Sequence, residues 1–183
     1  MLDIPTKNRL FSLFSLLFLK KLRMKTNVTS LPIKGKSRRT ECPPRVCVKG
    51  GGLPRGLRNC NPLNIRHSKS RWKGMARDQT DPAFVRFTTM AYGYRAAFCL
   101  LRTYRVKYGY NTLRKIIKRW APPSENNTER YIQNVSQWTG IDPDKILTCQ
   151  DANAMIQIVA AMSRMENGIP ANLEEVSQGY RMI

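Results

Sequence analysis

Apolar residues recur at helical spacing from residue 90 to residue 168, and this pattern constrains the fold more than any other feature of the chain. Glycine and proline interrupt it at the points where helices are expected to end, since proline cannot continue a helix and glycine often terminates one. The pattern predicts four helices, over about 90–108, 113–120, 127–139 and 151–168. The next segment, ANLEEVSQGY, predicts one or two further helical turns.

Residues 55–87 follow a different pattern. The segments NIRH, RWKG and FVRF are short, alternate polar and apolar residues, and are separated by turn-forming residues. They predict a small β-hairpin or a three-stranded lobe. Residues 55–183 are therefore expected to form one α+β domain, mostly helical, with the β-hairpin lobe on its N-terminal side.

Residues 1–54 are rich in Pro, Gly, Lys and Arg and are expected to form a disordered basic arm. The apolar run LFSLFSLLFL is too short to span a membrane as a helix and has the length of a signal-peptide core. However, Lys20 and Lys21 follow it directly, and no small-residue cleavage site does. The segment before Met24 is either an amphiphilic anchor or an overextended gene start. Without a signal peptide, the protein is expected in the cytoplasm before release.

The chain carries a formal net charge of +20, with 14 Lys or Arg and 2 acidic residues in positions 1–60, and 18 and 10 in the rest. Nucleic acid and the anionic polymers of a bacterial cell wall both suit this charge. No nucleic-acid-binding motif accompanies it. No cofactor motif occurs either, and Cys42, Cys47, Cys60 and His67 lack the usual spacing of a zinc site, so neither a cofactor nor a metal is predicted.

Glu166 lies where the apolar face of the fourth predicted helix continues. Met155, Ile158, Val159 and Met162 mark that face, and the next helical step reaches Glu166. Burial and the partial negative charge of a helix C-terminus both disfavour an ionised carboxylate there. A carboxyl group that keeps its proton suits general acid catalysis of glycosidic bond cleavage. The alternative is that Glu166 caps the last turn and pairs with an arginine.

The segment from residue 56 to residue 72 is a polar loop with several amide side chains. Asn61, Asn64, Arg66 and Trp72 suit recognition of sugar hydroxyl and N-acetyl groups, because amides both donate and accept hydrogen bonds and indole offers a flat apolar face. Asn and Pro are also common in tight turns, so a purely structural loop is the alternative.

Two other acidic residues are candidates for an auxiliary electrostatic role. Glu125 follows two prolines and precedes the third predicted helix, whose positive N-terminal end favours an ionised carboxylate. Asp81 precedes a predicted strand, where it would face a cleft in a two-lobed glycosidase. Each also has a structural alternative, as part of a helix start or of an Asp-Pro turn.

The motifs RGLRNCNPLNIR, RWKGM, DPAFVRF, YGYRA and RWAPPSENNTERY, within about residues 55–180, resemble a family of phage and prophage-like proteins. Some members are described as virion structural proteins and others as lysozyme-type wall hydrolases. The chain departs from the family pattern at Cys60, inside the usual Asn run, and at Leu63, often Gly. Further candidates for substrate contacts lie within these motifs: Tyr94, Trp120, Asn126 and Tyr131.

The resemblance implies a peptidoglycan-cleaving glycosidase, either a muramidase or a lytic transglycosylase. The alternative is a non-catalytic virion structural or cell-wall-binding protein. Peptidoglycan and other virion proteins are the implied partners. The implied location is the virion or, after export, the cell wall.

A second resemblance is to phage-type lysozymes, whose catalytic acid ends a helix in a short Glu-Gly context. Here MENG closes the last long predicted helix, while the hairpin-like region comes first. A circular permutation of the lysozyme plan would give this order. The hypothesis predicts that Glu166 lies across a cleft from residues 64–88, within about 15 Å, because a proton donor must come close to its leaving group.

Overall fold

The computed structural model describes residues 52–148 and 151–183, which belong to one compact unit of the chain. The predictions for the basic arm, for the apolar run and for Cys42 and Cys47 lie outside these residues. The described part contains six helices: α1 (Arg55–Arg58), α2 (Met90–Tyr108), α3 (Leu113–Trp120), α4 (Thr128–Thr139), α5 (Ala152–Asn167) and α6 (Leu173–Arg181). No helix within the described ranges is both long enough and apolar enough to cross a membrane.

The helical part of the prediction is confirmed. Helix α2 begins after Thr89, whose side chain accepts a hydrogen bond from the Tyr92 amide, and ends at Gly109, which has a left-handed backbone with φ of 66°. Asn127 caps α4 in the same way as Thr89 caps α2, through a bond from the Arg130 amide. These caps explain why the helix ends fall at the residues that the sequence indicated. Helix α6 is longer than the one or two turns expected.

The prediction of an α+β domain with a β-hairpin lobe is wrong. The described residues contain no strand; residues 59–88 form an irregular loop region in which Arg66 pairs with Phe84, and Met75 with Phe87, only as isolated antiparallel bridges. The protein is therefore helical in its described part. The circular permutation of a lysozyme with a hairpin lobe loses its structural basis.

Side-chain amides supplement a few backbone hydrogen bonds in the loop region. Asn61 binds the backbone of Ile65 through both its N–H and its carbonyl oxygen, at 2.9 Å each, and donates to the Val85 carbonyl at 2.8 Å. Gln79 bonds to the Arg86 amide and carbonyl at 2.8 and 2.9 Å. Backbone bonds also join the segments, from the Val85 amide to the Ile65 carbonyl at 2.9 Å and from the His67 amide to the Ala83 carbonyl at 3.1 Å. This pairing does not extend beyond isolated bridges, so no strand forms in the loop region.

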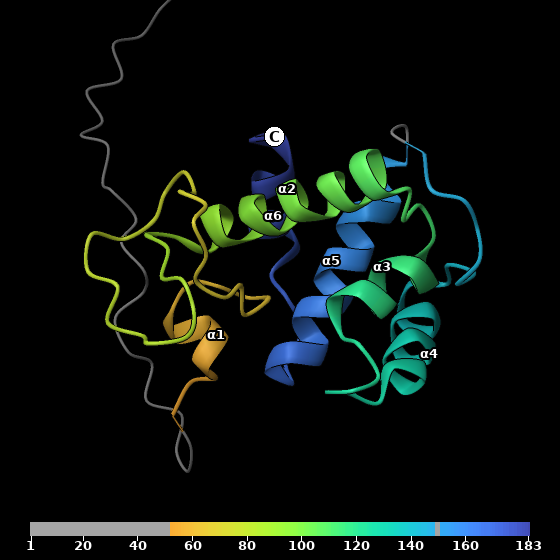
Figure 1. Cartoon of the computed structure of the whole chain (residues 1–183), viewed down its shortest axis with the longest axis horizontal. Helices are drawn as coiled ribbons and strands as arrows, with labels where there is room; N and C mark the ends of the chain where they lie inside the picture. Colours follow the sequence, from red (N-terminus) through yellow and green to blue (C-terminus); the bar gives the residue numbers. More distant parts are fainter. Residues whose placement is uncertain (1–51, 149–150) are drawn as a thin grey trace, which may run out of the picture. The chain divides into compact units, whose positions relative to one another are not determined.

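Helix α5 is central to the helical part, because it contacts α1, α2, α4 and α6 (Figure 1). The apolar face predicted for this helix is buried, with Ile158, Val159 and Met162 each 0% exposed. Helix α2 lies along α6, and the two backbones approach closely at Gly179. A Cβ atom there would lie 2.6 Å from Cβ of Tyr94, so a side chain at this position would push α6 away from α2.

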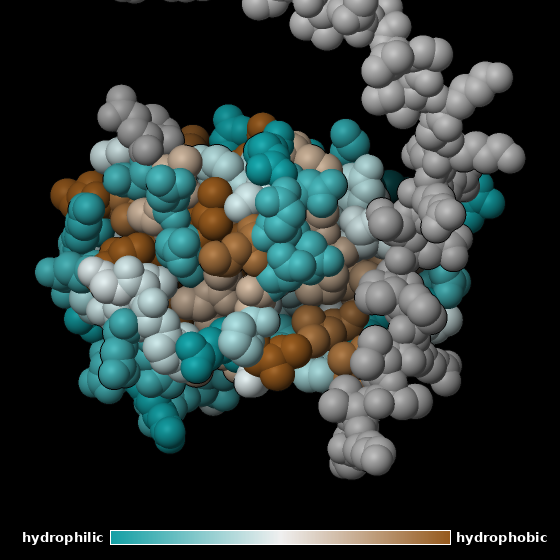
Figure 2. Space-filling view, turned by 180° about the vertical axis from the view of Figure 1, so that it is seen from behind, coloured by the Kyte–Doolittle hydropathy of each residue, from teal (hydrophilic) through white to brown (hydrophobic). Residues whose placement is uncertain are grey.

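The surface carries apolar side chains mainly in small groups. On the face shown in Figure 2, brown apolar residues of the described part lie between teal polar residues. Trp138, which helical spacing places on the inner face of α4, is 38% exposed, and the guanidinium of Arg164 lies 4.1 Å from its ring centroid. Arginine stacking of this kind shields an aromatic face from water.

Candidate functional site

Glu166 is held at the C-terminal end of the central helix. It is the penultimate residue of α5, which ends at Asn167 and is capped by Gly168 with a left-handed φ of 73°. Its side chain is half-buried, which is less than the continuation of the apolar face suggested. The end of α5 therefore presents a carboxylate at the boundary between core and solvent.

Three neutral side chains donate hydrogen bonds to this carboxylate. Asn64 Nδ2 lies 3.1 Å from Oε2, while the Tyr131 hydroxyl and Trp120 Nε1 lie 3.2 and 3.4 Å from Oε1. The donors come from the polar loop, from α4 and from the last residue of α3. We call Glu166, Asn64, Trp120 and Tyr131 the Glu166 cluster. Asn64, Trp120 and Tyr131 lie 102, 46 and 35 positions from Glu166 along the chain, so the cluster forms only when the chain folds.

No lysine or arginine of the described residues forms an ion pair with Glu166. Elsewhere in the same residues acidic side chains do find arginines, as in the pairs of Asp78 with Arg86 and of Glu174 with Arg181. In a chain with 32 Lys and Arg residues, the half-buried Glu166 carboxylate is thus held by neutral donors alone among the described residues.

Tyr131 is a permanent donor in this cluster. Burial, together with the nearby Glu166 carboxylate, raises the pKa of the Tyr131 hydroxyl well above its usual value near 10. The hydroxyl therefore stays protonated at neutral pH. It also lies 3.4 Å from the Met162 carbonyl, so its proton is shared between the carboxylate and the helix backbone.

The loop that carries Asn64 is fixed to the end of α5. Asn64 has a left-handed backbone with φ of 51°, a conformation that asparagine tolerates better than most residues. Asn167 donates to the Pro62 carbonyl at 2.7 Å and to the Ser163 carbonyl at 2.8 Å. A Cβ on Gly56 would lie 2.6 Å from Asn167 Oδ1 and 3.0 Å from Asn64 Oδ1, so only glycine leaves room for both amides.

The sequence did not indicate that Asn167 and Gly56 belong to the site or that they lie in contact. Neither was among the predicted site residues. Neither position carries a local signal that the two lie in contact, because their proximity arises from the packing of α1 against α5.

Asp81 belongs to a separate cluster. Its carboxylate accepts bonds from Arg55 at 2.6 and 2.7 Å, from Asn59 at 2.7 Å, and from the Ala83 and Phe84 amides at 2.9 Å each. The Arg55 guanidinium, followed by the Asn59 amide, holds the pKa of this carboxyl far below its usual range. Asp81 is thus ionised and fully bonded within the loop region, where it ties α1 to the start of the segment 83–87.

The structure does not join Glu125 to the Glu166 cluster. Glu125 is exposed in the turn after the two prolines, where its amide donates to the Pro122 carbonyl at 3.0 Å. Asn126 is exposed beside it. Arg66 is also exposed, with its guanidinium 5.7 Å from the Phe84 ring centroid.

The other candidates for substrate contacts are buried to different degrees. Asn61 is 0% exposed and its amide is bonded to backbone. Tyr94 is 1% exposed; its hydroxyl lies 3.1 Å from that of Ser163, and burial raises its pKa to about 12. Trp72 packs against the core, and its buried indole N–H has no acceptor. Of the predicted site residues, the structure brings Asn64, Trp120 and Tyr131 to Glu166.

The fold and the Glu166 cluster describe a small helical domain with an organised acidic site at one end of its central helix. The chain is similar to Protein P5 of Pseudoalteromonas phage PM2, with 42% identity over 130 residues that cover 69% of this chain and 79% of the relative. It belongs to the family of this phage protein, which confirms the expected link to phages. No family model matches the chain.

Proposed function

We propose that this protein is a phage-associated protein that acts on the bacterial cell wall, with the Glu166 cluster as the site that cleaves the peptidoglycan glycan. The observation that carries the proposal is the half-buried Glu166 carboxylate, which neutral donors from three separate segments orient and which no cation of the described residues neutralises. A carboxyl group positioned in this way suits proton transfer to a glycosidic oxygen.

A single carboxyl group favours a reaction in which the substrate supplies its own nucleophile. Asp81 is committed to Arg55, and Glu125 is exposed in a separate turn, so neither provides the second carboxylate of a two-carboxylate glycosidase. In a lytic transglycosylase reaction, Glu166 protonates the leaving oxygen as the bond from C1 breaks. The C6 hydroxyl of the same sugar then bonds to C1 and returns its proton to the carboxylate.

The donors of the cluster would have distinct parts in this reaction. Asn64 and Tyr131 hold the two carboxylate oxygens separately, one on Oε2 and the other on Oε1. This arrangement fixes the plane of the carboxyl group. Fixed orientation lowers the entropic cost of reaching the reactive geometry.

The second candidate function is a non-catalytic virion structural or cell-wall-binding protein. The comparison supports this candidate more directly, because the relative is a phage protein whose name states no activity. The Glu166 cluster would then serve to lock the polar loop onto the end of α5. The net charge of +20 suits attraction to the anionic polymers of the wall in either case. Peptidoglycan and other virion proteins are the proposed partners, and the virion or the wall is the proposed location.

Incubation of the purified chain with bacterial sacculi distinguishes the candidates. Release of soluble muropeptides, detected by chromatography and mass spectrometry, supports cleavage, and products lighter by one water indicate an intramolecular attack. Glu166→Gln is expected to abolish release while Glu125→Gln, the matched change at an exposed carboxylate, retains it. Sedimentation with sacculi without any release would support the second candidate. Release by Glu166→Gln at the wild-type rate would remove Glu166 from the reaction.

A further inference from the structure

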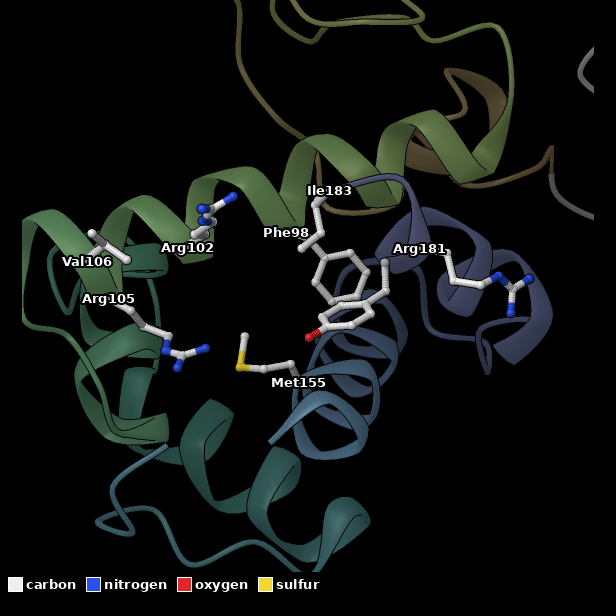
Figure 3. Close-up of a pocket in the computed structure, with 8 residues that line it drawn as sticks. Phe98, Arg102, Arg105, Val106, Met155, Arg181 and Ile183 are labelled. Carbon is white, nitrogen blue, oxygen red and sulfur yellow. The ribbon is translucent and has the colours of Figure 1, made fainter. Parts of the chain in front are cut away.

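A cavity of about 560 Å³ lies at the other end of the central helix. It is formed by α2, the start of α5, and α6 with the residues that follow it (Figure 3). Its volume falls within the range of about 300–1,000 Å³ that is typical of small-molecule sites. Met155 of α5 lines the cavity, and roughly 16 Å of helix separate this residue from Glu166 at 1.5 Å per residue. The cavity is therefore distinct from the Glu166 cluster.

Apolar side chains form part of the cavity wall, both at its floor and at its rim. Phe98 and Met155 form the floor and are 2% and 4% exposed, and the Phe98 ring meets the Tyr180 ring edge-on at a centroid distance of 5.1 Å. At the rim, Val106 and Ile183 are 79% and 43% exposed. Such a wall favours an apolar group of a ligand, because the surface of Val106 and Ile183 would leave water on binding.

Arg105 places a positive charge inside this apolar wall. In Figure 3 its guanidinium points into the middle of the cavity, toward Met155, whereas the Arg181 side chain points away. Arg105 Nη2 donates to the Leu147 carbonyl at 3.3 Å, but its Nε–H is buried and has no acceptor. The guanidinium end, which points into the cavity, can donate to an anionic oxygen of a ligand.

No carboxylate of the described residues pairs with Arg105 or with Arg102 at the same cavity. Asp151 is near enough for Arg105 to contribute to the lowered pKa of its carboxyl, but that carboxylate accepts bonds from the Thr148 amide and hydroxyl at 2.6 and 2.8 Å. Arg102 and Arg105 therefore have no ion-pair partner among the described residues, and the cavity keeps a cationic character.

We propose that this cavity binds a compact amphiphilic anion, with a phosphate or carboxylate group on Arg105 and a short apolar group against Phe98 and Met155. A guanidinium suits these anions because its planar donors match two oxygens at once. The proposal does not depend on the function proposed for Glu166.

Calorimetric titration of the full chain with octyl phosphate, below its micelle concentration, tests the proposal. Wild type is expected to bind one molecule saturably, and to bind inorganic phosphate and octanol at least tenfold more weakly, since each has only half of the required chemistry. Arg105→Gln is expected to weaken octyl phosphate binding at least tenfold. Arg77 is exposed in the loop region, and its side chain forms no hydrogen bond or ion pair with the described residues. Arg77→Gln therefore makes the same charge change away from the cavity and should bind octyl phosphate within twofold of wild type.

A measurement on wild type alone covers the case in which Arg105→Gln does not fold. Octyl phosphate should shift the NMR signal of the Met155 methyl group and leave that of Met75, in the loop region, in place. Absence of saturable binding, equal affinity for octanol, wild-type affinity in folded Arg105→Gln, or an unmoved Met155 signal would each overturn the proposal.

Vesicles distinguish the two sources of such an anion. Arg105-dependent binding to vesicles with phosphatidic acid, but not to vesicles of phosphatidylcholine alone, would identify a lipid headgroup with part of its chain. Binding of octyl phosphate without vesicle binding would identify a free molecule. Both outcomes require the same pairing of Arg105 with a phosphate.

Discussion

The amide of Asn64 donates a hydrogen bond to the Glu166 carboxylate at 3.1 Å, across 102 positions of the chain. This contact joins the polar loop to the end of the central helix, with no arginine of the described residues between them. Two local features make it, a left-handed backbone at Asn64 and a helix that ends one residue after Glu166. The loop and the helix therefore depend on each other for their positions.

Asn64→Ala is expected to lower the free energy of unfolding by about 1–3 kcal/mol, because the carboxylate loses a donor and alanine is strained at positive φ. Asn64→Gly should lower the free energy of unfolding by less, since glycine adopts a positive φ without strain. Urea unfolding of both variants measures the difference. Equal losses would mean that the backbone conformation contributes nothing.

Tyr131→Phe removes only a hydroxyl from the cluster. Bonds to a charged group contribute about 1.5–3 kcal/mol, and this one is long at 3.2 Å, so a loss near the lower end is expected. Urea unfolding again gives the value. If Glu166 is the proton donor, this variant should also shift the pH profile of muropeptide release, because the environment of the carboxyl group changes. An unchanged profile in an active variant would separate Tyr131 from the chemistry.

Alkaline pH is expected to destabilise the protein through its buried tyrosines. Burial raises the pKa of Tyr94 to about 12 and that of Tyr131 well above 10, so the folded chain holds protons that the unfolded chain releases. The resulting stability is complete below pH 10 and falls as pH rises from 10 through the folded pKa values. Unfolding in urea from pH 8 to pH 12 measures this loss, and Tyr94→Phe should make it smaller. A loss of the same size in that variant would exclude Tyr94 as a source.

Asp81→Asn is expected to destabilise the loop region by about 1–3 kcal/mol, because Arg55 and the bonded amides lose a charged acceptor. The pKa of this carboxyl is depressed, so its contribution is present above the ordinary range near 4 and is lost as pH falls toward the folded pKa. Thermal unfolding at pH 7 and at pH 3 should show a difference between wild type and variant at both pH values, only partly smaller at pH 3, because the folded carboxyl group stays ionised there while the unfolded one has begun to bind its proton. Asp78→Asn, at a carboxylate that is 68% exposed, is the control and should change little.

The helices could be predicted from the sequence because their signals are local. Thr89 and Gly109 bound α2 at the residues that the pattern indicated, since a cap and a left-handed glycine act within one turn. The β-hairpin prediction failed for a non-local reason. Alternation in NIRH and FVRF suggested strands, and the two segments do pair, but only through one isolated bridge, with the Asn61 amide bonded to the backbone of both. Alternation along the chain does not encode how far such a pairing extends.

The site was predictable in part for the same reason. The apolar face of α5 indicated burial at Glu166, and the side chain is half-buried, while the lack of an arginine partner could not be foreseen from 32 basic residues. Asn64, Trp120 and Tyr131 stood out one by one as candidate contacts. Their convergence on one carboxylate depends on how α3 and α4 pack, which spacing along the chain does not encode. No sequence pattern marks Arg105 as a site residue, because its buried donor without an acceptor exists only in the folded protein.

Because 102 positions separate Asn64 from Glu166, the ribosome adds the two residues at different times. A ribosome that adds about 5–20 residues per second makes Asn64 roughly 5–20 s before it makes Glu166. During that interval the polar loop, α3 and α4 are synthesised before the carboxylate that their donors bind. The nascent chain therefore carries no assembled acidic site, and a host cell that makes this protein meets the complete cluster only when α5 has been translated and packed.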